Sequence, residues 1–85
     1  MKNFYSLYSN LYTFSNCVKQ ALYFSNKGMI NSVNKYEVIC IACISTLYDI
    51  GRLTDDEYTS ITSQTTGIFN KMRTKCNAII SNNKE

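Results

Sequence analysis

The residues best equipped for chemistry in this chain are four cysteines, Cys17, Cys40, Cys43 and Cys76. Cys40 and Cys43 form a C-x-x-C pair, and residues three positions apart share a face of a helix. Four thiolates can hold a tetrahedral zinc ion, and two can form a disulfide or a redox pair. However, Ile41 and Ala42 give the pair apolar surroundings, and free cysteine is often fully buried. We therefore expect ordinary core cysteines with no metal and no cofactor, and keep zinc and a disulfide as alternatives.

Three consecutive acidic residues, Asp55, Asp56 and Glu57, could suggest metal binding or acid–base catalysis. Consecutive positions at a helix start point in different directions, and Glu57 is placed to form a capping box with Thr54. The chain has no histidine, no serine or cysteine beside a recognisable base, and no glycine-rich phosphate loop. Because these are the groups from which active sites are built, we expect no enzymatic activity and no catalytic residues.

A central helix is predicted over residues 34–50. Asn34 is suited to cap its N-terminus, with Glu37 reaching back to the Asn34 amide. Gly51 follows its C-terminus, where a left-handed residue commonly ends a helix. The run Val38–Ile44 is apolar on every side, which indicates burial on more than one face. A buried strand is the alternative for so short a run, but the caps on both sides favour a helix.

A second helix start follows Gly51 directly, with Thr54 as the cap and Glu57 three residues later. Residues 54–80 are therefore predicted as a helix, joined to the central one by a tight helical hairpin at Gly51. Gly67 costs about 1 kcal/mol relative to alanine inside a helix, so we expect a bend there, or a break. Residues 81–85 are polar and are expected to form a frayed tail.

The first helix is predicted over residues 3–27, ending at Gly28. Apolar residues recur there at alternating steps of three and four: Phe4, Leu7, Leu11, Phe14, Val18 and Ala21. This spacing is typical of a helical seam. The result is a single all-α domain of residues 1–85, a three-helix domain with a buried central helix. If the outer helices extend past the central one, their seams favour self-association.

The chain carries no sequence signal for a membrane or for export. No apolar run approaches the roughly 20 residues that span a bilayer. The N-terminus is aromatic and rich in asparagine and serine, which differs from the basic and apolar regions of a signal peptide. We expect a cytoplasmic protein that does not engage a membrane.

Charge is segregated along the sequence, although the net charge is only +3. Residues 1–36 carry four lysines and no acid, residues 37–57 are mainly acidic, and residues 58–85 are basic again. Lys71, Arg73 and Lys75 form a small basic patch that could be solvated, contact phosphate or meet an acidic protein. A helix-turn-helix DNA reader is disfavoured, because the helix after the turn begins with three acids that phosphates would repel.

These features together predict a small non-enzymatic protein–protein interaction module. Tyrosine is abundant and well suited to contact surfaces, so the candidate partner-binding residues are Tyr5, Tyr12, Tyr23, Lys71, Arg73 and Lys75. Abundant Asn, Ile and Lys with no Trp or His is typical of AT-rich phage and mobile-element genes, so we expect an accessory protein that binds and inhibits a host protein. The alternatives are a nucleic-acid-binding protein that uses its basic N- and C-terminal helices, and a structural homo-oligomer such as a homodimer.

Overall fold

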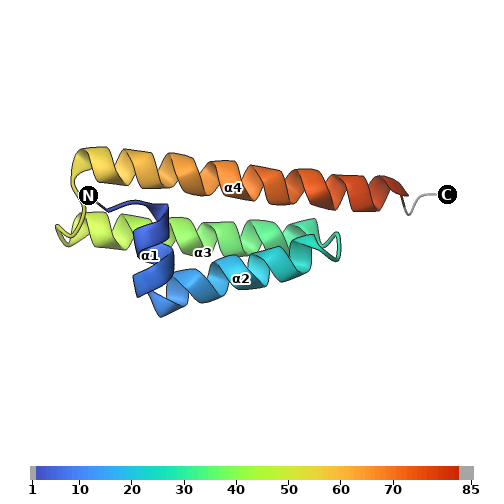
Figure 1. The fold of residues 1–85 in the computed structure, drawn as a ribbon, viewed down its shortest axis with the longest axis horizontal. Coiled ribbons are helices and arrows are strands. Elements are labelled where there is room, and N and C mark those ends of the chain that lie inside the picture. The colour runs from blue at the N-terminus through green and yellow to red at the C-terminus, as the bar shows by residue number, and fades with distance from the viewer. Residues whose placement is uncertain (1, 83–85) are drawn as a thin grey trace.

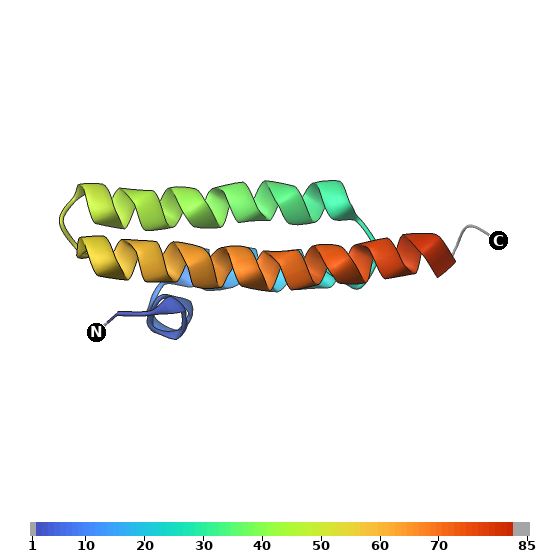
Figure 2. The same cartoon turned by 90° about the horizontal axis from the view of Figure 1, so that it is seen from above.

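A computed structural model describes residues 2–82, which form four α-helices (Figure 1). Their bounds are Phe4–Asn10 (α1), Tyr12–Ser25 (α2), Ile30–Asp49 (α3) and Asp55–Asn82 (α4). Helices α2, α3 and α4 run along the long axis of an elongated molecule of 50 × 21 × 17 Å, and α1 lies across it (Figures 1 and 2). The all-α class is confirmed, but with four helices rather than three.

The predicted first helix over residues 3–27 is divided by a break at Leu11, and its last helical residue is Ser25, two residues earlier than predicted. Leu11 has extended backbone angles (φ −116°, ψ 107°), which end α1 and precede α2. The predicted seam survives, since Phe4 packs edge-on against Phe14 with ring centroids 5.3 Å apart. The break allows α1 to turn across the bundle and reach α4, where the Phe4 amide donates to Gln64 Oε1 at 3.0 Å.

The residues before α1 also tie this helix to the hairpin between α3 and α4. The Lys2 amide donates to Glu57 Oε2 at 2.7 Å, and Lys2 Nζ donates to the Arg52 carbonyl at 2.6 Å. The Asn3 side chain caps the start of α1 through the Ser6 amide. The Lys2 contacts join residues fifty or more positions apart in the sequence. Local helix propensity therefore cannot predict them.

Helix α3 begins at Ile30, four residues earlier than predicted. Asn34 and Glu37 therefore do not cap its start; both lie inside the helix and accept hydrogen bonds from Arg73 of α4. Val33 lies in the added first turn and is completely buried. Burial of Val33 and the contacts with α4 explain why the helix extends past the predicted cap.

The central position of α3 is confirmed, since α2 and α4 both pack on it, but α3 is not enclosed. Its inner side buries Val33, Cys40 and Ile44 completely. Its outer side leaves Ala42 exposed, and Val38 is 68% exposed. The expectation that Val38–Ile44 would be buried on more than one face is met where α2 and α4 pack on α3, but Val38 and Ala42 lie on a side that no other helix of residues 2–82 covers.

The hairpin at Gly51 is confirmed in its details. Gly51 has a positive φ of +77°, and the Arg52 amide donates to the Leu47 carbonyl at 2.8 Å. Thr54 and Glu57 form a reciprocal capping box: Thr54 Oγ1 accepts from the Glu57 amide, and Glu57 Oε1 accepts from the Thr54 amide. Local cap chemistry accounts for the helix end at Gly51 and the helix start at Thr54, which is why the sequence predicts this turn well.

Helix α4 is continuous through Gly67, so the break considered there does not occur. Residues 81 and 82 of the predicted tail still belong to this helix, and residues 83–85 lie outside the described residues. The C-terminal part of α4 extends past the start of α3 (Figures 1 and 2). Because the N-terminal helix breaks and turns, α4 alone overhangs in this way. No helix within residues 2–82 is long and apolar enough to cross a membrane.

The three glycines provide a test of this architecture. Gly28 has φ +71°, and a Cβ there would lie 3.0 Å from Ile79 Cγ2. We expect Gly28→Ala to lower the free energy of unfolding by about 2 kcal/mol, through backbone strain and the close contact. Gly67 is helical with open space around it, so Gly67→Ala should raise the free energy of unfolding by about 1 kcal/mol.

Urea denaturation measures both variants, with Gly51→Ala as the matched control. Gly51 has a positive φ but no atom within 4 Å of an added Cβ, so its substitution reports backbone strain alone. The loss of stability in Gly51→Ala should be smaller than in Gly28→Ala. A stabilising Gly28→Ala substitution would contradict the packing of the Gly28 turn against α4.

Candidate interaction surface

The side of α3 that faces away from the other helices carries a stripe of exposed residues. These are Lys35, Val38, Ala42, Thr46 and Asp49, which we call the α3 ridge. Their spacing of three, four, four and three residues places them on one face of the helix. The middle of the ridge is apolar or uncharged, and its two ends carry opposite charges.

An apolar groove runs beside this ridge between α2 and α3, and we call it the α2–α3 groove. Its volume is about 400 Å³, and it is lined by Leu11, Tyr12, Thr13, Phe14, Ile39, Ala42, Cys43, Thr46 and Leu47. None of these residues is an aspartate, glutamate, lysine or arginine. Tyr12 is the first residue of α2 and is 84% exposed. The groove therefore has uncharged walls and a large aromatic side chain beside it.

A second groove of about 410 Å³ lies on the other side of the ridge, between α3 and α4. Val38, Ile41, Thr62 and Thr66 line it together with Glu37 and Arg73. The two grooves differ in charge, because this one includes an ion pair. The ridge thus separates an uncharged groove from one with a polar end.

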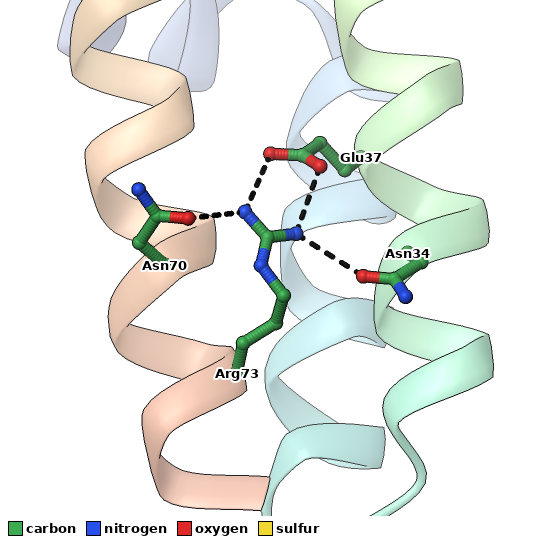
Figure 3. Close-up of polar contacts among 4 residues, drawn as sticks. All are labelled: Asn34, Glu37, Asn70 and Arg73. Carbon is green, nitrogen blue, oxygen red and sulfur yellow. Dashed lines mark hydrogen bonds and ion pairs between the residues drawn. The ribbon is translucent and has the colours of Figure 1, made fainter. Parts of the chain in front are cut away.

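The polar end of the second groove is organised by Arg73 (Figure 3). Its guanidinium forms two hydrogen bonds to the Glu37 carboxylate, at 2.8 and 3.2 Å. It also donates to Asn34 Oδ1 at 3.1 Å and to Asn70. Such bidentate charge-assisted bonds fix geometry well. Arg73, predicted to bind a partner, is therefore engaged within the fold, and it joins α4 to α3.

Lys71 and Lys75, the other predicted basic residues, are exposed on α4. Lys75 donates to the Asn26 side chain at the end of α2. Lys71 lines a small groove of about 200 Å³ with Tyr5 of α1. The structure therefore brings Lys71 close to Tyr5, while Arg73 faces α3.

The three candidate tyrosines do not form one surface. Tyr5 lies on α1, and its ring packs edge-on against Phe4. Tyr23 lies near the end of α2, where it packs against Phe24 and beneath Lys27 Nζ. Tyr12 lines the α2–α3 groove and is the most exposed of the three. Of the candidates, Tyr12 is the one placed beside an apolar groove of this size.

The ridge and most of the groove were not predicted from the sequence. Val38, Ile39 and Ala42 belong to the run that was predicted to be buried on more than one face. One signal could have indicated the open face: Lys35, Ala42 and Asp49 recur every seven residues, so two charges share a face with a small residue. Charged residues at both ends of a helical face are typical of a face that meets water.

The cysteines occupy two kinds of environment. Cys17, Cys40 and Cys76 are buried, and Cys43 lines the α2–α3 groove. Burial, together with the nearby Cys17 and Cys43 thiols and Glu37, raises the pKa of Cys40 to about 12. Burial also raises the pKa of Cys17 and of Cys76. Within residues 2–82, no three metal-ligating side chains are grouped to hold an ion.

No protein family, curated protein or solved structure gives a match to this chain. The chemistry of the ridge and of the two grooves is therefore the basis for a functional proposal.

Thiol reactivity tests the placement of the cysteines. We expect a thiol reagent at neutral pH to modify Cys43 first in the folded protein, because the thiolate is the nucleophile and Cys43 lines an open groove. The buried cysteines should react only when the protein unfolds. Peptide mapping by mass spectrometry identifies the modified residue, and protein unfolded in urea is the control in which all four react. Early modification of Cys40 would contradict its burial.

Proposed function

We propose that this chain is a non-enzymatic protein-interaction module that binds a host or cognate protein through the α2–α3 groove. The observation that carries this proposal is Tyr12, which is 84% exposed beside a groove with no charged wall. A tyrosine in this position contributes little to the stability of its own domain. Tyrosine is enriched among the residues that dominate binding energy at interfaces, because it offers a large rigid surface and one hydroxyl.

The residues that line the groove indicate which kind of partner segment it would bind. Leu11, Ile39 and Leu47 supply apolar walls, while Thr13 adds a hydroxyl. Thr46 Oγ1 already donates to the Ala42 carbonyl within α3. The groove therefore suits a partner segment with one or two large apolar side chains, as when an amphipathic helix binds in a groove. By covering such a segment, this chain would modulate or inhibit its partner.

Two ionisable groups outside the core, Glu57 and Tyr48, have shifted pKa values, and structural contacts explain both shifts. The pKa of Glu57 is lowered by its bonds to the Thr54 and Lys2 amides. The pKa of Tyr48 is raised because its hydroxyl donates to the Asp55 carboxylate. Both groups lie at or beside the Gly51 hairpin, outside the α2–α3 groove. Their shifted pKa values arise from the cap and turn contacts, so they do not require a catalytic explanation.

Alanine substitution of Tyr12 tests the proposal in an affinity capture from the native cells. We expect Tyr12→Ala to weaken capture of the partner by roughly thirtyfold, the effect of losing about 2 kcal/mol at an interface hot spot. The melting temperature should stay close to that of the wild type, because the side chain is mostly in water. Quantitative mass spectrometry of the captured proteins provides the measurement.

Tyr23→Ala is the matched control, since Tyr23 is also an exposed tyrosine of α2 but lies at its other end. This variant should retain the partner. Equal capture by wild type and Tyr12→Ala, or loss in both variants, would contradict binding through the α2–α3 groove.

A second candidate function is nucleic-acid binding, which is supported by exposed lysines in the half of the bundle toward Gly28. Lys27, Lys71 and Lys75 are exposed there, and Arg73 is held by Glu37. In this case affinity for DNA or RNA should fall steeply with salt, with a logarithmic slope of about −0.9 per phosphate contact on duplex DNA.

Fluorescence anisotropy with a duplex at several salt concentrations tests this candidate. The double variant Lys71→Gln/Lys75→Gln should then reduce the magnitude of the salt slope by about two. Lys2→Gln, at the opposite end of the bundle, is the control for removing a lysine charge elsewhere, and it should leave the salt slope unchanged. Absence of binding at low salt would exclude the nucleic-acid function.

A further inference from the structure

We propose that the α3 ridge pairs with the ridge of a second copy of this chain, in an antiparallel arrangement with its two-fold axis at Ala42. Two ridge residues, Ala42 and Thr46, also line the α2–α3 groove, but Tyr12 lies on α2 outside the ridge. The pairing is therefore a separate proposal from partner binding and does not depend on it. Three features support it: the position of two opposite charges, the side chains between them, and the charge distribution of the whole molecule.

The two charges lie symmetrically about Ala42. Lys35 and Asp49 are each seven residues from it, or about 10.5 Å along the helix axis. Both are exposed and both belong to the ridge. In an antiparallel pair that crosses at Ala42, Lys35 of each copy lies opposite Asp49 of the other. A parallel pair would instead place like charges together, so the charges select the antiparallel arrangement.

The residues between these charges suit helix–helix contact. Ala42 at the crossing point is small, so two helix axes can approach to the usual separation of about 8–10 Å. Val38 lies four residues before Ala42 and Thr46 four residues after it, so each Val38 would pack against Thr46 of the other copy. Val38 is 68% exposed in the single chain. Removing its side chain from water favours association.

The overall charge distribution favours the same arrangement. The half of the bundle toward Gly28 carries exposed lysines at positions 27, 35, 71 and 75. The opposite end, at the Gly51 hairpin, carries Asp49, Asp55, Asp56 and Glu57 against Lys2 and Arg52, so it is acidic on balance. Antiparallel pairing brings the basic end of each copy to the acidic end of the other. Such complementary potentials fix orientation and accelerate encounter.

The geometry also determines where the grooves lie in the pair. The two-fold axis of two antiparallel helices in face-to-face contact keeps both copies of α2 on one side. The two α2–α3 grooves would therefore open on the same side of the dimer. Two binding grooves on one face would allow a bivalent partner to be held more strongly than by either groove alone. A contact made by one helix ridge is small, so the dimer should be weak and should weaken further in high salt.

Reversing the charge at Lys35 or at Asp49 tests the pairing. Sedimentation velocity of the purified variants measures how strongly each one dimerises. The Lys35→Asp substitution places an acid opposite Asp49 of the other copy, and Asp49→Lys places a base opposite Lys35. We expect each variant alone to dimerise at least about tenfold more weakly than the wild type. A mixture of the two variants should form a heterodimer, because its two variant positions lie opposite each other with opposite charges. The double variant Lys35→Asp/Asp49→Lys should recover the homodimer.

Disulfide trapping gives a second and independent readout. In a Cys43→Ser background, Ala42→Cys places two thiols at the two-fold axis, where their Cα atoms can approach within the roughly 4.4–6.8 Å that a disulfide requires. Oxidised glutathione supplies the oxidant and is reduced as the disulfide forms. Asn77→Cys is the control, since Asn77 is exposed on α4. We expect a covalent dimer with Ala42→Cys and little with Asn77→Cys.

The outcomes separate this proposal from the proposed function. A monomer at every concentration, an unchanged dimer in both charge variants, or equal trapping at positions 42 and 77 would overturn the antiparallel pairing. None of these results involves Tyr12. The effect of Tyr12→Ala on partner capture tests separately whether the partner binds through the α2–α3 groove. Recovery of dimers in the mixture and in the double variant would support the pairing, because a general loss of folding could not produce it.

Discussion

The inner face of α3 is the constraint on which the rest of this structure depends. Val33, Cys40 and Ile44 are completely buried there, and both α2 and α4 pack on α3 more extensively than on each other. Helix α2 has only 14 residues against 20 in α3, so it covers part of the length of α3, and α1 turns across the bundle (Figure 1). Within residues 2–82 there is no further helix to cover the outer side of α3. The ridge and its grooves are therefore consequences of the architecture.

The two sides of α3 are held differently. On the α4 side, the Gly51 hairpin joins α3 to α4 at one end of the pair. Nearer the other end, the Arg73–Glu37 ion pair fixes the register between the two helices, and it is the only ion pair among residues 2–82. On the α2 side, the contacts include apolar packing and the stacking of Phe24 on Tyr36. Apolar packing is less directional than charge-assisted hydrogen bonding. The α2–α3 groove thus lies on the side with fewer directional constraints, which suits the accommodation of a partner.

The parts of the fold that were predictable are those that local chemistry determines. The Gly28 and Gly51 helix ends and the Thr54–Glu57 capping box involve residues within a few positions of one another. The break at Leu11 was not predictable in this way. It is accompanied by long-range contacts, such as that of Lys2 with Arg52. Local sequence patterns cannot predict such contacts. The early start of α3 has the same origin, because the contacts of Asn34 and Glu37 with Arg73 lie across the helix pair.

The candidate surface was predictable only in part, for a related reason. Tyr12 was predicted to be a partner-contact residue from its type, but the groove beside it is completed by α3 residues such as Ile39 and Leu47, which lie far from it in the sequence. Apolar content alone suggested that Val38–Ile44 would be buried, whereas burial depends on how many neighbouring helices are present. The symmetric placement of Lys35 and Asp49 about Ala42 is visible in the sequence, but it becomes meaningful only when the structure shows that this face is open.

The most direct test of the open face of α3 is a series of amide NMR spectra of the isotopically labelled protein alone, recorded over a wide range of concentration. Self-association through the ridge should shift the resonances of residues 35–49 as concentration rises, and the shifts should diminish at high salt. Resonances of the outward side of α4, such as that of Asn77, should stay unchanged. Concentration-dependent shifts confined to α4 or α1, or none in α3, would contradict the proposal that α3 presents an interaction surface to a second copy.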